Sequence, residues 1–297
     1  MNILCLDQEI ELANAVANLL GCECVTPEQR YFPDGEHYLR FSDDIFNEDV
    51  FVFFNLHQPD NKILPLLFTV GYLRDRGVKR IVLVTPYLPY MRQDIQFKSG
   101  ECVTSRYFSK IVSDSLDGLI TVDPHLHRYH SLDEIYSIPS TVIHATNAIA
   151  EWITNNVEHP VIIGPDDESR QWAETVAQLA SCPVTVLRKT RLGDRDVRVE
   201  MEDSHEYKHH QPVMVDDIIS TGKTVIETSR LMALAGMKSP VVIGVHAVLA
   251  KGAATELDQS LIASWLTCNT ISHASNGIDL STDIATAIRR FWTLEKA

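Results

Sequence analysis

Short runs of apolar, largely β-branched residues alternate with longer amphipathic stretches along most of the chain. Near-continuous Val, Ile and Leu runs are typical of strands buried on both faces, and apolar residues at helical spacing predict the helices that cover them. The expected strands are 2–5, 50–55, 80–84, 118–122, 161–164, 184–187, 213–215, 241–245 and 261–267, and the expected helices are 8–20, 62–76, 103–115, 147–156, 169–180, 224–235 and 282–293. The pattern predicts an α/β protein built on parallel sheets.

The alternation has no low-complexity linker, and a boundary near residue 145 divides the chain into two comparable halves. Each half contains a strand that leads into a polar loop and then a helix, at 81–94 and at 213–224. We therefore expect two tandem domains, 1–145 and 146–297, each with a mainly parallel sheet flanked by helices. Ligands are expected at the carboxyl ends of the strands. The last amphipathic helix is expected to pack back on the N-terminal domain.

Composition narrows the class of protein. Of the 297 residues, 45% are hydrophobic and 22% are charged, as in ordinary globular proteins. No apolar run reaches the roughly 18 residues of a membrane helix, and the first residues lack the features of a signal peptide, so we expect a cytoplasmic protein that does not enter a membrane. The formal net charge of −14 disfavours nucleic acid and anionic lipid as partners. An anionic substrate would need local cations or Mg²⁺.

Six cysteines are present, and among them Cys22 and Cys24 form a Cys-x-Cys pair. No second pair is spaced to complete a zinc site with them. Reduced thiols are therefore the expected state of the cysteines.

The stretch 213–224 joins an expected strand to an expected helix and reads Val-Met-Val-Asp-Asp-Ile-Ile-Ser-Thr-Gly-Lys-Thr. The hydroxyls of Ser220, Thr221 and Thr224, together with backbone N–H groups at the helix start, can hold a phosphate dianion. Gly222 allows the backbone to approach the ligand closely. The stretch therefore predicts a phosphate site.

Two acids in the same stretch refine that prediction. Asp216 and Asp217 do not bind phosphate directly, but they suit sugar hydroxyls or a Mg²⁺ held between a sugar and a diphosphate. A simple helix cap after a strand would explain one hydroxyl but not paired acids. A Walker-type loop would need a glycine at the position of Asp217, with four residues between it and the Gly222-Lys223 pair. A sugar phosphate is the preferred ligand.

The stretch resembles the phosphoribosyl diphosphate motif of type I phosphoribosyltransferases and of ribose-phosphate diphosphokinases, also called PRPP synthetases. Four further segments favour the diphosphokinases. The segment 30–36, Arg-Tyr-Phe-Pro-Asp-Gly-Glu, is similar to a family segment that reaches the ATP site of a neighbouring subunit. The resemblance implies that Phe32 stacks on adenine and that Asp34 and Glu36 accept hydrogen bonds from it. A Pro-Asp-Gly turn without function is the alternative.

The segment 85–94 resembles the family's Pro-Tyr-x-x-Tyr-x-Arg-Gln-Asp sequence, which implies ATP binding by Arg92, Gln93 and Asp94. Arg92 can neutralise phosphate charge.

The segment 122–125 is similar to the family's Asp-Leu-His, although Pro124 replaces leucine, and it implies that His125 is a Mg²⁺ ligand. The neighbours His127 and His130 are expected at the surface or in contact with ligand residues rather than with a metal, because nothing at zinc-like spacing completes a site with them.

The segment 186–191 resembles the Lys-x-Arg that opens the family's catalytic loop, which implies catalytic roles for Lys189 and Arg191. The charged stretch 192–210 that follows is expected to be a mobile lid. In the segment 164–169, the resemblance implies that Asp166 binds Mg²⁺ or ribose, but Glu168 and Ser169 stand where the family has two glycines.

The resemblance implies the reaction of MgATP with D-ribose 5-phosphate to give AMP and 5-phospho-α-D-ribose 1-diphosphate, in a homo-oligomer of at least two subunits. Two alternatives remain open. A phosphoribosyltransferase would share the 216–224 loop, and a silent regulatory relative would explain the missing glycines after Asp166. Ser220 and Lys223 also depart from the family pattern, which has Asp and a small residue there. Lys223 either adds a phosphate contact or points to solvent.

Overall fold

The computed structural model describes residues 2–42, 49–126, 128–164, 169–191, 197–201 and 206–294. Contacts within the chain divide it into two compact units, Met1–Ile143 with Ser281–Ala297, and His144–Leu280. The division falls next to the boundary expected near residue 145. The C-terminal helix α8 (Ser281–Leu294) therefore belongs to the first unit, although the whole second unit precedes it in the sequence.

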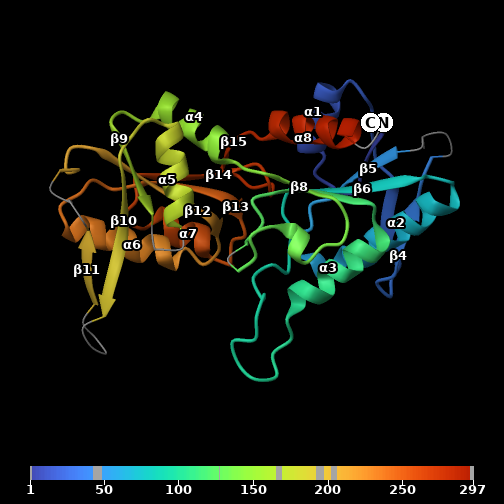
Figure 1. The fold of residues 1–297 in the computed structure, drawn as a ribbon, viewed down its shortest axis with the longest axis horizontal. Helices are drawn as coiled ribbons and strands as arrows, with labels where there is room; N and C mark the ends of the chain where they lie inside the picture. The colour runs from blue at the N-terminus through green and yellow to red at the C-terminus, as the bar shows by residue number, and fades with distance from the viewer. Residues whose placement is uncertain are drawn as a thin grey trace. The chain divides into compact units, whose positions relative to one another are not determined.

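Across the described part of the first unit, a six-stranded parallel sheet forms in the order β2-β1-β5-β6-β7-β8 (Figure 1). Its strands are β1 (Asn2–Cys5), β2 (Cys24–Val25), β5 (Asp49–Phe53), β6 (Arg80–Thr85), β7 (Gly118–Val122) and β8 (Ser140–Ile143). A separate antiparallel hairpin joins β3 (Glu28–Tyr31) to β4 (His37–Arg40). Parallel pairing requires a crossover between successive strands, and helices supply most of these crossovers.

Helices cover both faces of this sheet. The remaining helical segments of the unit are α1 (Glu11–Leu20), α2 (Ile63–Asp75), α3 (Thr104–Ser115) and the short 3₁₀ turns η1 (Pro59–Asn61) and η2 (Leu132–Glu134). Alternate strand residues such as Leu4, Val52 and Leu83 share a buried cluster with apolar residues of α2 and α3. The α8 helix packs against α1 and β8. Because both faces are buried, the strands are apolar at almost every position.

The second unit repeats this plan. Its sheet, counted over the described residues, has seven strands in the order β11-β10-β9-β12-β13-β14-β15, and all pairs except β10–β11 are parallel. The strands are β9 (Pro160–Gly164), β10 (Val184–Arg191), β11 (Val197–Met201), β12 (Gln211–Ile219), β13 (Val241–Ala247), β14 (Ser264–Cys268) and β15 (Asn276–Ile278). The helices are α4 (Thr146–Asn156), α5 (Arg170–Leu179), α6 (Lys223–Leu234) and α7 (Ala253–Asp258).

The predicted α/β class, with helix-flanked and mainly parallel sheets, is confirmed. Two predictions at the functional segments are wrong. The strand expected at 213–215 continues to Ile219, so Asp216 and Asp217 lie inside β12 rather than after it. The loop expected from 192 onward is interrupted by β11, which pairs with an extended β10 to form a hairpin. The polar side chains at these positions do not show the apolar pattern of a buried strand, so the extension of β12 and the β10–β11 hairpin could not be predicted from it.

The C-terminal helix is attached to the first unit by polar contacts as well as by packing. The indole Nε1 of Trp292 donates a hydrogen bond to Asp49 Oδ2 at 3.0 Å, and Arg80 Nη2 lies 3.1 Å from the same oxygen. The buried ring of Phe291 lies against Gly118, where an added Cβ would come within 2.3 Å of the ring. Glycine at 118 is therefore a packing requirement of the α8 contact.

We predict that Gly118→Ala destabilises the protein by about 1–3 kcal/mol, because the new methyl group displaces a buried ring. Urea denaturation followed by circular dichroism measures the change. Gly71→Ala on α2 is the matched control, since nothing lies within 4 Å of its added Cβ, and it should be neutral or stabilising. Equal stability of the two variants would contradict the packing requirement.

Candidate functional site

The predicted phosphate loop lies at the junction of β12 and α6 in the second unit. The buried first half of β12 leads to Asp216 and Asp217, which are half-buried, and Asp216 pairs in register with Gly244 of β13. The Asp217 N–H donates to Asp216 Oδ1 at 3.0 Å. Both acids are therefore held by a paired strand, which is more rigid than the loop that we expected to carry them.

The turn into α6 depends on Gly222. Its φ of +71° lies in the left-handed region that disfavours residues with a Cβ, and an added Cβ would meet Leu257 at 3.1 Å. The Lys223 N–H donates to Thr221 Oγ1 at 3.4 Å, and the Ala250 N–H donates to the Ser220 carbonyl at 3.2 Å. The turn is thus tied both to the helix start and to the segment after β13.

The start of α6 has the properties of an anion site. The first N–H groups of a helix have no acceptor within the helix, and the helix dipole favours negative charge there. Thr221, Lys223 and Thr224 are exposed at this end, while Ser220 is half-buried. The structure therefore brings the five predicted phosphate residues, Ser220 to Thr224, to one helix N-terminus that solvent can reach.

A buried histidine stands beside this loop, and the sequence patterns did not single it out. His246 of β13 pairs in register with Ile218, and its Nδ1 lies 2.9 Å from Thr270 Oγ1. The Thr270 hydroxyl donates to the Val245 carbonyl at 2.8 Å, so Nδ1 must carry the proton in the His246–Thr270 contact. The contact fixes the histidine tautomer in the strand next to Asp216 and Asp217.

In the first unit, the segment after β6 carries Arg92, Gln93 and Asp94. Arg92 is exposed and Gln93 is half-buried. The Thr104 hydroxyl donates to Gln93 Oε1 at 3.3 Å. The amide NH₂ group of Gln93 therefore points away from Thr104 and can act as a donor elsewhere. Asp94 is only 4% exposed, and Arg128 Nη1 lies 2.8 and 3.0 Å from its two oxygens. The three residues therefore differ in their access to a ligand.

The segment 30–36 forms the tip of the β3–β4 hairpin. The Phe32 N–H donates to the Glu36 carbonyl at 2.8 Å, and Gly35 has a φ of +92° within the turn. The Phe32 ring is 40% exposed, and the Arg30 guanidinium lies 4.7 Å from its centroid. Asp34 and Glu36 are exposed on the same tip. The tip from Phe32 to Glu36 thus presents an aromatic ring and two carboxylates to solvent.

The segment after β7 begins with a strained residue. Asp123 is buried with a φ of +30°, which is unusual for a residue with a Cβ, and its N–H donates to the Ile143 carbonyl at 2.9 Å. His125 follows in a half-buried position, His130 is exposed as expected, and His127 lies outside the described residues. Strain at the end of a parallel strand is frequent at functional sites, and here it precedes the candidate metal ligand.

A second polar group occupies the carboxyl edge of the first sheet and was not anticipated. Asp7 follows β1, and it accepts from the Asn55 N–H at 2.7 Å and from Lys62 Nζ at 3.4 Å. Burial raises the pKa of Asp7 to about 6, and the two donors oppose that rise. Burial and the charge of Lys62 lower the pKa of His57. The edge therefore holds a part-buried ion pair between Asp7 and Lys62.

The catalytic candidates Lys189 and Arg191 lie on β10, where their backbones pair with Val199 and Val197 of β11. They are therefore part of a hairpin and do not open a loop, and the rest of the expected lid lies partly outside the described residues. Asp166 and Glu168 also lie outside them. Within the described residues, no three His, Cys, Asp or Glu side chains gather as a metal cluster, and no helix is long and apolar enough to cross a membrane.

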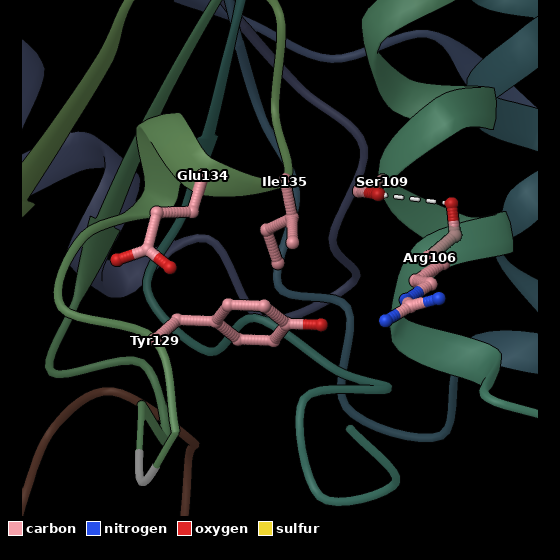
Figure 2. A pocket seen from close by; sticks show the side chains of 5 residues that line it. All are labelled: Arg106, Ser109, Tyr129, Glu134 and Ile135. Carbon is pink, nitrogen blue, oxygen red and sulfur yellow. Dashed lines mark hydrogen bonds between the residues drawn. The ribbon is translucent and has the colours of Figure 1, made fainter. Parts of the chain in front are cut away.

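A pocket of about 310 Å³ opens elsewhere on the first unit. Arg106 and Ser109 of α3 line it on one side, and the segment after β7 contributes Tyr129, Glu134 and Ile135 (Figure 2). None of the predicted site residues lines this pocket. Glu134 Oε1 accepts from the His130 N–H at 2.7 Å, so this carboxylate already holds the segment in place.

Two family models match the chain. Residues 1–115 match the N-terminal domain of ribose phosphate pyrophosphokinase, and residues 131–284 match the phosphoribosyl transferase domain. The first matched region contains the hairpin tip and the segment at 85–94, and the second contains the β12–α6 loop. These predicted site regions therefore fall inside matched domains, whereas His125 lies between the two matched regions.

Curated relatives match over nearly the whole chain. A ribose-phosphate pyrophosphokinase of Methanobrevibacter smithii is 32% identical over 291 residues, which cover 94% of this chain and 97% of that protein. A ribose-phosphate pyrophosphokinase of Saccharolobus solfataricus is 30% identical and covers 92% and 95%. The crystal structure of phosphoribosylpyrophosphate synthetase from Mycobacterium smegmatis superimposes with a TM-score of 0.85, at 23% identity and 98% coverage of each chain, and so shares the fold.

We predict that Gly222→Ala costs about 2–3 kcal/mol of stability, because it combines left-handed strain with crowding at Leu257. Gly252→Ala is the matched control, since Gly252 has a φ of +86° before α7 but nothing within 4 Å of its added Cβ, and it should cost about 1–2 kcal/mol. Urea denaturation of both variants gives the comparison. A smaller loss for Gly222→Ala than for the control would contradict the packing argument.

Proposed function

Since the chain belongs to the ribose-phosphate pyrophosphokinase family, we propose that it transfers the β,γ-diphosphate of MgATP to C1 of D-ribose 5-phosphate. The products are AMP and 5-phospho-α-D-ribose 1-diphosphate. The observation that carries the proposal is the β12–α6 junction, where two strand-held acids lead into an accessible helix N-terminus. That arrangement suits a ligand with hydroxyls at one end and a phosphate at the other.

Ribose 5-phosphate is proposed to bind at this junction. Its phosphate lies at the start of α6, with the hydroxyls of Ser220, Thr221 and Thr224 and the backbone at Gly222 as donors. Asp216 and Asp217 accept from the ribose hydroxyls. Because the paired strand holds both acids, the sugar is oriented by a rigid element, and its C1 hydroxyl keeps a fixed direction relative to the bound phosphate.

ATP is proposed to use residues of the first unit. Arg92 is exposed and can neutralise phosphate charge, while the Gln93 amide NH₂ can donate to the nucleotide. Phe32 offers adenine the ring face opposite Arg30, and Asp34 and Glu36 accept from the adenine amino group. By the family resemblance, this hairpin serves the site of a second subunit, so the working form is a homo-oligomer of at least two chains.

Mg²⁺ fits the donor set at the β12–α6 junction. This ion prefers oxygen ligands and is held in nucleotide sites by one or two carboxylates together with phosphate oxygens and water. The half-buried Asp216 and Asp217 meet that requirement, and His125 and Asp166 remain proposed ligands from the resemblance. When bound, Mg²⁺ would neutralise diphosphate charge.

The chemical step is an attack of the ribose C1 hydroxyl oxygen on the β-phosphorus of ATP. The bond from the β-phosphorus to the α,β-bridging oxygen breaks, AMP leaves with that oxygen, and the hydroxyl proton passes to solvent. Phosphoryl transfer of this kind depends on alignment and charge neutralisation. Lys189, Arg191 and Arg92 are the proposed cations at the transferring group.

We also propose a cytoplasmic location, since all six cysteines are free thiols, as expected in a reducing compartment.

The direct test is incubation of the protein with MgATP and ribose 5-phosphate. We expect AMP and 5-phospho-α-D-ribose 1-diphosphate in equal amounts, measured by chromatography and by ³¹P NMR. Consumption of added 5-phospho-α-D-ribose 1-diphosphate with a nucleobase, without AMP formation from ATP, would instead indicate a phosphoribosyltransferase. Absence of both reactions would favour a silent regulatory relative and contradict the proposal.

We predict that Lys223→Ala raises the KM for ribose 5-phosphate about 5-fold and leaves the KM for MgATP unchanged. The reason is the loss of one exposed charge contact to phosphate at the start of α6, worth about 1 kcal/mol. Arg230→Ala is the control, because Arg230 is an equally charged, exposed residue farther along the same helix. If both variants keep the wild-type KM, Lys223 points to solvent and makes no phosphate contact.

A further inference from the structure

Two segments that carry candidate ATP residues are joined by an ion pair between an exposed arginine and a buried aspartate. Asp94 lies in the segment after β6 and Arg128 lies in the segment after β7, and these strands are parallel neighbours. Arg128 Nη1 lies between the two carboxylate oxygens of Asp94, at 2.8 and 3.0 Å. The Asp94 side chain is 4% exposed, whereas that of Arg128 is 43% exposed. A carboxylate this buried requires its cation, because an unpaired buried charge is strongly destabilising.

The segment on the Asp94 side is held at several further points. Tyr90 has a φ of +61°, its ring lies 4.9 Å from that of Phe108, and its hydroxyl donates to Asp60. The hydrogen bond to Asp60 raises the pKa of Tyr90 to about 12. Beyond it, the Ser105 N–H donates to the Gln93 carbonyl at 3.4 Å. Arg92 and Gln93 therefore lie between anchored residues on both sides.

The segment on the Arg128 side is short. Two residues separate Arg128 from His125, and the strained Asp123 precedes them at the end of β7. The Arg128 guanidinium also lies 5.3 Å from the Phe97 ring centroid, which adds a contact to the loop that follows Asp94. A single side chain thus connects the His125 segment to the Arg92–Gln93 segment.

We propose that the Arg128–Asp94 ion pair is a clasp that sets the positions of Arg92 and Gln93 relative to His125 for ATP binding. Arg128 and Asp94 are then positioning residues that act through their neighbours. The assignment changes the role expected for Asp94, whose buried carboxylate is occupied by Arg128 rather than presented to the nucleotide. The proposal rests on the proposed function only for the identity of the nucleotide.

The form of the contact makes a conservative replacement informative. A single guanidinium nitrogen contacts both oxygens, so the pair does not use the two-nitrogen fork that distinguishes arginine from lysine. A lysine ammonium at position 128 can occupy the same place between the oxygens. Arg128→Lys should therefore preserve most of the clasp, and Arg128→Ala should abolish it.

The experiment compares Arg128→Ala, Arg128→Lys and Asp94→Asn in steady-state assays with MgATP and ribose 5-phosphate. We expect Arg128→Ala to raise the KM for MgATP at least 10-fold while the KM for ribose 5-phosphate, whose loop belongs to the second unit, stays within 2-fold. Arg128→Lys should return the KM for MgATP to within about 3-fold of wild type. Adding Asp94→Asn to Arg128→Ala should change the KM little further, because one interaction has already been lost.

Lys110→Ala is the matched control. Lys110 on α3 forms an exposed ion pair with Asp114 at 2.8 Å, and its loss should leave both KM values and the thermal midpoint unchanged. The proposal is overturned if Arg128→Ala leaves the KM for MgATP unchanged, or if it lowers only the thermal midpoint. It is also overturned if Asp94→Asn is neutral while Arg128→Ala is impaired, because Arg128 would then contact the nucleotide itself.

Failure of the clasp and failure of the proposed function give different results. Titration of wild type and variants with MgATP alone, followed by calorimetry, measures nucleotide affinity without turnover. A wild-type protein that binds MgATP but forms no AMP contradicts the proposed function, while a weaker affinity of Arg128→Ala still supports the clasp. A wild-type protein that forms AMP, with Arg128→Ala unchanged in affinity, contradicts the clasp alone.

Discussion

Burial of parallel sheets on both faces is the constraint on which the rest of this structure depends. In each unit, helices cover the two faces, so central strands such as β5, β6, β9 and β13 are largely apolar. Polar side chains have room mainly where the strands end and the chain turns toward the next helix. The two groups of candidate site residues therefore occupy carboxyl strand ends in their own units, at β6 and β7 in one and at β12 in the other.

Three of the polar groups that enter the interior near the strand ends are paired. Asp94 is held by Arg128, Asp7 by Lys62 and the Asn55 N–H, and His246 by Thr270. Removing a partner from such a group costs more than the contact itself contributes, since the remaining group stays buried without compensation. These pairs thus limit the ways in which the strand-end segments can be arranged, and they give the exposed residues between them, such as Arg92, a defined position.

The candidate ligand-binding residues are held in place by different contacts in the two units. At the β12–α6 junction, a paired strand and a glycine with positive φ hold the acids and the helix start directly. At the β6 and β7 ends, longer segments carry the candidate residues, and side-chain contacts anchor them. The departures from the family pattern at Ser220 and Lys223 lie in this junction, where a change of side chain would alter the proposed ligand contact without altering the backbone that supports it.

The sequence by itself determined the fold class, the order of nearly all central strands and helices, and the family, because buried parallel strands and motif order are local properties of the chain. It also placed Gly222 and Lys223 at the turn from a strand into a helix, and Arg92 in the segment that follows a strand. Only the tertiary structure decided that Asp216 lies inside a strand, that Lys189 belongs to a hairpin, and that Asp94 is buried against Arg128. Strand extension and ion pairing depend on a partner distant in sequence, and the residues of a single segment do not specify that partner.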